Sequence, residues 1–154
     1  MKKIIAIFAS ALILIALIYN VGLEIRAIKN AKVEIYDAKL GKINLIHRYV
    51  TLNLSIKIIN DEKKRIEDLQ GKFNIYILNV SIGEMNFSKI DIPSYSSRSI
   101  SMRIKIYFDK VAESIVEAIK KLNFKITLKG YIKGKIFFSL IDYKQNVEAS
   151  YQYI

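Results

Sequence analysis

The sequence predicts a mainly β protein, an antiparallel β-sandwich with one α-helix, preceded by an N-terminal transmembrane helix. Three observations lead to this prediction. Residues 4–21 carry no charge, apolar and polar residues alternate along most of the remaining chain, and residues 109–122 instead show helical spacing. A chain of 154 residues fits a single domain, and enough remains after the N-terminal segment to form a hydrophobic core.

The uncharged segment runs from Ile4 to Val21, follows Lys2 and Lys3, and ends shortly before Glu24. As a helix it would be about 27 Å long, close to the roughly 30 Å hydrocarbon core of a bilayer. Residues 19–24 offer no small-residue cleavage site, so residues 1–25 are predicted to be a retained membrane anchor. A cleaved signal peptide and a buried core helix are the alternatives.

The charges around this segment bear on which side of the membrane the domain occupies. Lys2 and Lys3 lie on one side of it, and Arg26, Lys29 and Lys32 lie on the other. A count of Lys and Arg therefore gives no firm answer. The short basic start is typical of a signal-anchor, which would make this a single-pass protein with an extracytoplasmic domain.

Period-two alternation predicts about seven strands after Glu24. Val33 and Ile35 begin the first, and the others cover residues 50–58, 73–77, 100–108, 124–128, 136–140 and 147–153. The apolar phase changes around residues 78–82, which indicates a bulge or a strand buried on both faces, and Gly83 with Glu84 is expected to turn the chain. The serine-rich stretch around Pro93, residues 90–99, is expected to be a loop or irregular edge.

Residues 109–122 are predicted to form the one helix of the domain. Their apolar residues fall on one helical stripe, with Asp109 as the expected N-cap: Val111, Ile115, Val116, Ile119 and Leu122. Because only this connection is long enough for a helical crossover, the strands are expected to be antiparallel. Phe73, Phe108, Phe124 and Phe138 lie on apolar strand phases and are expected in the core.

The net charge is +11, and the loss of Lys2, Lys3 and Glu24 leaves +10 on residues 26–154. Such a charge attracts anionic lipid or nucleic acid. Only five of the 25 basic residues are Arg, the side chain that reads bases best, so nucleic acid is not the expected partner. The chain contains no cysteine, which excludes disulfides and thiolate chemistry.

No group of residues has the spacing of a catalytic, cofactor or metal site, so no site residue of these kinds is predicted. His47 is the only histidine and has no acidic partner at ligand spacing. The serines of residues 94–101 would need a distant base. The acidic residues at 61–68 alternate with Lys63, Lys64 and Arg65 and are expected to pair with them on a solvated loop. Gly130 and Gly134 are interpreted as bulge or turn glycines.

The motifs and their order resemble the late embryogenesis abundant group 2 family (LEA14-like), also called the water stress and hypersensitive response (WHy) domain. A long alternating strand ends Ile58-Ile59-Asn60-Asp61-Glu62, where the family has Asn-Pro-Asn and Asp61 takes the place of the proline. Residues 73–84, then Ile92-Pro93-Ser94-Tyr95-Ser96 leading into 100–108, then the helix and the segment ending at Gly130 follow in the family's order. The likeness covers about residues 30–145.

This resemblance implies a fibronectin III or immunoglobulin-like sandwich over residues 30–154 without catalytic residues or cofactors. Archaeal members are similar in carrying one N-terminal membrane segment. The implied role is non-enzymatic stress or desiccation protection, through weak binding to membranes, anionic lipid or proteins. A module for lipid or apolar ligands and a structural subunit of a cell-surface assembly are the alternatives.

Overall fold

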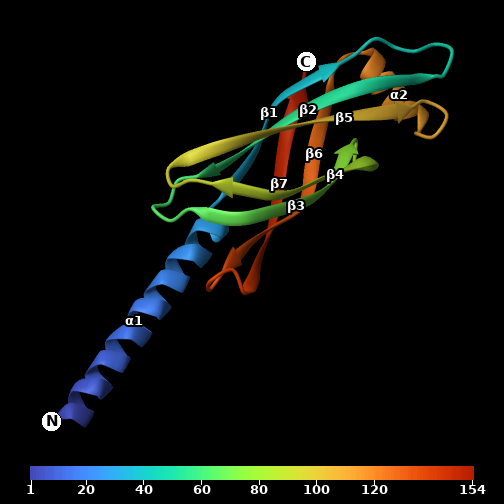
Figure 1. Cartoon of the computed structure of the whole chain (residues 1–154). Helices are drawn as coiled ribbons and strands as arrows, with labels where there is room; N and C mark the ends of the chain where they lie inside the picture. The colour runs from blue at the N-terminus through green and yellow to red at the C-terminus, as the bar shows by residue number, and fades with distance from the viewer.

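The computed structural model describes residues 1–154 and shows a long helix that projects from a β-sandwich (Figure 1). The helix, α1, spans Lys2–Lys29 and continues almost directly into the first strand. The remaining elements are β1 (Lys32–Leu40), β2 (Tyr49–Asn60), β3 (Ile66–Ile77), β4 (Val80–Ile92), β5 (Ser96–Tyr107), α2 (Glu113–Lys120), β6 (Phe124–Ile136) and β7 (Ile141–Tyr153). The predicted fold class is confirmed.

The seven strands form two antiparallel sheets. One has the strand order β1-β2-β5, and the other has the order β4-β3-β6-β7. Because β1 follows α1 directly, the end of the sandwich where β1 starts lies next to the helix, and we call it the helix-proximal end. The connections 61–65, 93–95 and 137–140 lie at this end. The connections 41–48, 78–79 and 108–123 lie at the distal end, together with α2.

The space between the sheets is filled by apolar side chains. The alternation predicted for the second strand is confirmed, because Val50, Leu52, Leu54, Ile56 and Ile58 are all buried. They belong to a core of 26 buried apolar residues from both sheets and both helices. Polar residues of β2 such as Asn53 face outward, which is the arrangement expected of a sheet with one solvated face.

The turn predicted at Gly83 lies elsewhere, and part of the segment predicted to be a bulge or a strand buried on both faces is a turn. The phase change at residues 78–82 is a two-residue hairpin turn, in which Leu78 and Asn79 have φ values of 50° and 63°. Successive positive φ values match the twist of the flanking strands. Asn tolerates a positive φ well, whereas Leu is not a residue from which such a turn would be predicted. Gly83 lies inside β4 and does not turn the chain. The stretch 90–99, expected to be a loop or irregular edge, is a short connection at 93–95 flanked by the ends of the edge strands β4 and β5, and the pairing of β3 with β4 shifts register near Ile90.

The sixth strand also differs from the prediction. Gly130 and Gly134 are not turn residues but lie inside one continuous strand, β6, and the turn falls at residues 137–140. A Cβ at Gly130 would overlap the carbonyl oxygen of Lys72 on β3, so this position needs glycine for close strand approach. Phe138 was expected in the core, but it lies in the turn and is 69% exposed.

The helix of the domain is shorter than predicted. It begins at Glu113 rather than Asp109, and Ala112 stands at the N-cap without a side-chain hydrogen bond. Ile115 and Ile119 are buried, as the stripe predicted, whereas Leu122 lies beyond the helix with a φ of 53° and is exposed. The apolar stripe was therefore informative about packing but not about the helix ends.

Candidate functional site at the base of the helix

The candidate site is the junction where α1 enters the sandwich. The apolar stretch of α1 is long enough to cross a membrane, and none of it is buried within the molecule. The last turn is different, because Ala27 and Ile28 are fully buried in the core of the domain. One continuous helix therefore exposes an apolar surface along most of its length and packs into the domain at its end.

Ile28 occupies a space that glycine provides. A Cβ placed on Gly134 would lie 2.6 Å from Cδ1 of Ile28 and 3.3 Å from Cγ2 of Ile66. The absence of a side chain at Gly134 thus allows the helix to approach β6. The glycine that the sequence suggested was a turn residue is a contact between helix and sheet.

Glu24, the first charged residue after the apolar stretch, joins the helix to the β6–β7 turn. The backbone N–H of Phe137 donates a hydrogen bond of 2.9 Å to Oε2 of Glu24. Nδ2 of Asn20 donates to Oε1 at 2.6 Å, and Nζ of Lys64 donates to Oδ1 of Asn20 at 2.9 Å. Both carboxylate oxygens of Glu24 are therefore satisfied, one within the helix and one by the sandwich.

A second set of contacts joins the helix to the β2–β3 connection. Glu62 accepts from Nε of Arg26 at 3.3 Å and from Nδ2 of Asn30 at 2.9 Å. Nζ of Lys63 donates to the hydroxyl of Tyr19 at 3.0 Å and lies over its ring. This hydrogen bond raises the pKa of Lys63, so the ammonium stays charged at neutral pH.

The acidic residues of this connection were expected to pair with their basic neighbours. Arg65 and Glu67 do so at 4.0 Å. Glu62 instead pairs with Arg26 on α1, and Asp61 pairs with Lys32 on β1 at 3.5 Å. The charges of the loop therefore tie the domain to its helix more than they tie the loop to itself.

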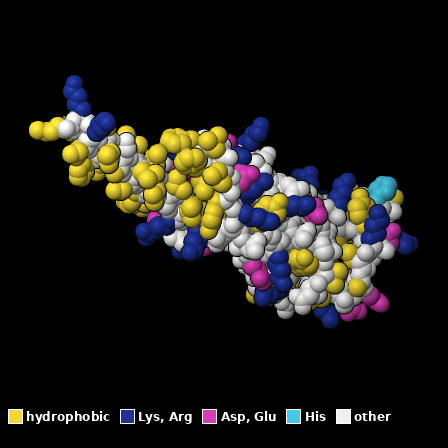
Figure 2. Space-filling view, turned by 90° about the horizontal axis from the view of Figure 1, so that it is seen from below, with side chains coloured by type: hydrophobic (Ala, Val, Ile, Leu, Met, Phe, Trp, Pro, Cys, Tyr) yellow, Lys and Arg dark blue, Asp and Glu magenta, His cyan; other side chains and the backbone are white.

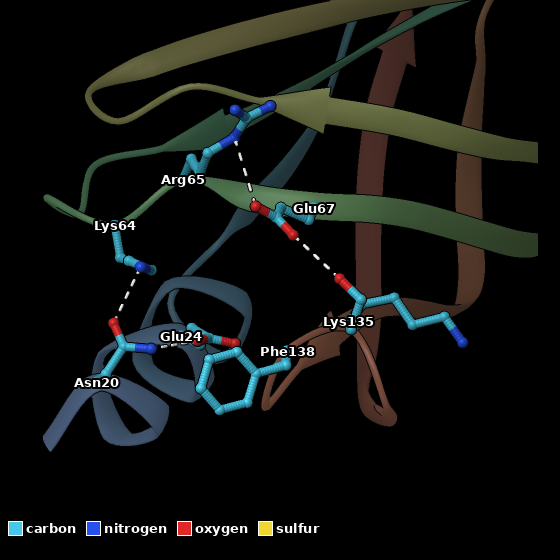
Figure 3. A pocket seen from close by; sticks show the side chains of 8 residues that line it. Asn20, Glu24, Lys64, Arg65, Glu67, Lys135 and Phe138 are labelled. Carbon is cyan, nitrogen blue, oxygen red and sulfur yellow. Dashed lines mark hydrogen bonds and ion pairs between the residues drawn. The ribbon is translucent and has the colours of Figure 1, made fainter. Parts of the chain in front are cut away.

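A hollow of about 260 Å³ lies between the helix and the sandwich (Figure 3). Eight residues line it, and only one of them is hydrophobic: Asn20, Glu24, Lys64, Arg65, Glu67, Lys135, Phe138 and Ser139. It is smaller than usual ligand pockets, and those are mostly apolar. Its polar groups are bonded to one another, with Ser139 Oγ donating to Glu67 at 3.1 Å. The hollow is therefore a structural feature of the junction rather than a ligand site.

Asn60 organises the loops of this end. It is the one buried polar residue of the chain. Its Nδ2 donates to the carbonyl oxygens of Lys64 at 2.9 Å and Pro93 at 3.2 Å, and its Oδ1 accepts from the N–H of Glu62 at 3.1 Å. One side chain thus holds the connections at 61–65 and 93–95 together.

The residues considered for chemistry lie elsewhere and apart. His47 is exposed on the distal connection, with its ring stacked near Tyr49. Ser101 pairs with Ser55 at 2.9 Å in mid-sheet, six residues along the strand from the end near His47, or about 20 Å. Nowhere do three His, Cys, Asp or Glu side chains gather in a way that would hold a metal ion.

Comparison with known proteins bears on the fold. No protein-family model matches the chain, and no curated protein matches it in sequence. Among solved structures, the Arabidopsis thaliana protein AT1g01470, a LEA14 family member, superimposes with a TM-score of 0.60 at 9% identity, over 80% of each chain. The fold is LEA14-like. Because the identity is low, this likeness supports the sandwich fold but says nothing about the activity.

Two further structures are similar in architecture. A Bordetella pertussis protein described as ApaA has a TM-score of 0.50 at 6% identity and covers 80% of this chain and 92% of its own. A protein described as late embryogenesis abundant, At2g46140.1, has a TM-score of 0.46 at 13% identity and covers 98% of this chain and 86% of its own. The resemblance in the order of the sequence motifs agrees with the three-dimensional likeness to AT1g01470.

Proposed function

We propose that this chain is a membrane-anchored, non-enzymatic domain, with residues 1–25 as a retained anchor and residues 30–154 as a LEA14/WHy-like sandwich at the bilayer surface. The observation that carries the proposal is the continuity of α1. The helix runs unbroken from the apolar stretch to Ile28, which is buried in the core. A cleavage within residues 19–24 would cut a helix whose side chains are bonded to two loops of the domain, and this favours retention over removal.

The proposed work of the domain is stress protection, such as desiccation tolerance, through weak contacts with membranes or proteins. The LEA14-like fold supports this role, and so does a Lys-rich surface suited to anionic lipid. Six lysine ammoniums lie within 5.7 Å of the centre of a tyrosine ring, so these six lysines make cation–π contacts. The lipid-transfer alternative gains no support from the space between the sheets, since the apolar core fills it.

Two measurements test the proposal. The anchor predicts that the intact mass of the mature protein includes residues 1–25 and that alkaline carbonate does not release it from membranes. A mature mass that lacks this segment would refute the anchor. The protective role predicts that deletion of the gene lowers survival of drying or salt stress and that the full-length chain restores it. Unchanged survival would refute this role and leave the anchor standing.

A further inference from the structure

The turn between β6 and β7 is apolar and exposed. Phe138, Leu140 and Ile141 are 69%, 72% and 50% exposed, and Phe137 lies half-buried beside them. Phe137, Phe138 and Ser139 have φ values of 53°, 55° and 60°. Turns with positive φ usually use Gly, Asn or Asp, so two bulky aromatic residues here are costly both for the backbone and for hydration. Phe137 packs against the core, whereas Phe138 and Leu140 stay exposed, so the cost of placing these two side chains here is not offset by burial within the molecule.

The position of this turn is fixed relative to the apolar helix. The N–H of Phe137 is bonded to Glu24, and Phe138 lines the same hollow as Asn20 and Glu24 (Figure 3). Glu24 lies only about 4.5 Å along the axis beyond Val21, where the apolar stretch ends. If the helix spans a bilayer, the turn therefore lies at the depth of the lipid headgroups.

The surroundings of the turn have the composition of a membrane interface. Tyr19 and Tyr95 are 60% and 72% exposed at this end of the molecule, and Lys63, Lys64 and Lys135 lie around the junction. Tyr is enriched at interfaces, and Lys meets anionic headgroups. Figure 2 shows a hydrophobic surface that covers the helix and widens where it meets the domain, with basic side chains beside it.

We propose that the β6–β7 turn inserts Phe138 and Leu140 into the headgroup–acyl boundary of the bilayer that α1 spans. This second contact fixes the rotation of the sandwich about the helix axis. The inference rests on the anchor proposed above, because the depth of the turn is set by the helix. The occupant is the bilayer rather than a protein, since the apolar turn is continuous with a surface that lipid covers.

The chain has no tryptophan, so a single introduced Trp reports its own surroundings. Three full-length variants in liposomes make the test: Phe138→Trp in the turn, Leu45→Trp in the distal connection and Phe8→Trp in the helix. Leu45 is the matched control, because it is an 83% exposed apolar loop residue at the other end of the 12-residue β2, about 36 Å away. Brominated lipid quenches only a Trp that it touches.

We expect Phe138→Trp to emit at shorter wavelength than Leu45→Trp and to lose intensity in brominated lipid, and the loss to grow with the fraction of anionic lipid. Quenching of Phe8→Trp with none at Phe138→Trp would overturn the inference and leave the anchor intact. A short-wavelength Phe138→Trp that brominated lipid does not quench would also overturn it, because a protein surface would then cover the turn. An unquenched Phe8→Trp would refute the anchor and the inference together.

Discussion

Asn60 ends β2 with its side chain fully buried, and its amide holds together two loops that each connect one sheet to the other. A buried amide is favourable only when its hydrogen bonds are made, and here they are made to backbone groups that have few other partners. The family resemblance marked this position through its Asn motif. The structure adds the reason: at the end where the chain crosses between the two sheets, the side chain of Asn60 bonds backbone groups that no strand pairs.

We expect Asn60→Ala to lower the free energy of unfolding by about 2–3 kcal/mol, because the part-buried carbonyl oxygens of Lys64 and Pro93 would lose their donor and the N–H of Glu62 would lose its acceptor. Urea unfolding of the full-length protein in detergent measures this. Asn53→Ala, on the same strand but exposed, is the control and should change stability by no more than about 0.5 kcal/mol. Equal effects of the two substitutions would show that the buried bonds are unimportant.

Phe138 shows where sequence reasoning failed at this scale. The alternation of β6 was extended through it, although Phe137 and Phe138 are adjacent and cannot both face the core of a strand. That break in period was the available signal. It was missed because the turn contains no Gly, Asn or Pro, and apolar residues are rarely placed in turns.

At the scale of elements, the contact between α1 and β6 depends on one missing side chain. Gly134 lies near the end of β6, and the side chain of Ile28 occupies the space where a side chain at this position would lie. The neighbouring strand β7 is joined to this part of β6 by an ion pair of 2.6 Å between Lys135 on β6 and Asp142 on β7. A hydrogen bond from Lys135 lowers the pKa of Asp142, so this carboxylate stays charged to lower pH than an ordinary aspartate.

We expect Gly134→Ala to destabilise the domain by about 1–3 kcal/mol, because the new Cβ would crowd Cδ1 of Ile28 in a packed core. Ile28→Val removes that atom, and the double variant should recover part of the loss. Thermal unfolding of the four proteins gives the coupling energy. Additive losses in this cycle would mean that the glycine serves the strand alone and not the helix.

Most strands followed from alternation, because one face of each sheet is buried and the other is solvated. The limits of elements followed less well. Leu78 forms a hairpin turn with a positive φ that its side chain disfavours, and α2 begins without the cap that Asp109 promised. In both places the tertiary contacts of neighbouring strands outweigh local preference. No local pattern pointed to the junction at Asn20 and Glu24, because their partners in the sandwich, Lys64 and Phe137, lie 44 and 113 residues away from them.

At the scale of the whole molecule, the two ends of the sandwich differ. The helix-proximal end carries tyrosines, lysines and the apolar turn, whereas the distal end carries the single histidine and the connection at 41–48. If the chain is anchored by α1, these ends face toward and away from the bilayer. The distal end is then the part of the domain that a partner from solution reaches first.

We expect the domain to be extracytoplasmic, as the signal-anchor interpretation predicts. Protease added to intact cells should then degrade residues 30–154 and leave a membrane-embedded fragment of the helix. A cytoplasmic marker protein must stay intact in the same sample. Resistance of the domain until the cells are lysed would place it on the cytoplasmic side.

The unbroken passage from α1 into the sandwich has a mechanical consequence. A flexible linker would let a domain drift independently of its anchor, but here Ile28 and Glu24 fasten the two together within one helix. Helices respond to a change in bilayer thickness by tilting. If α1 spans a bilayer as proposed, any tilt of the helix also tilts the sandwich, so a thinner or thicker membrane would displace the distal loops.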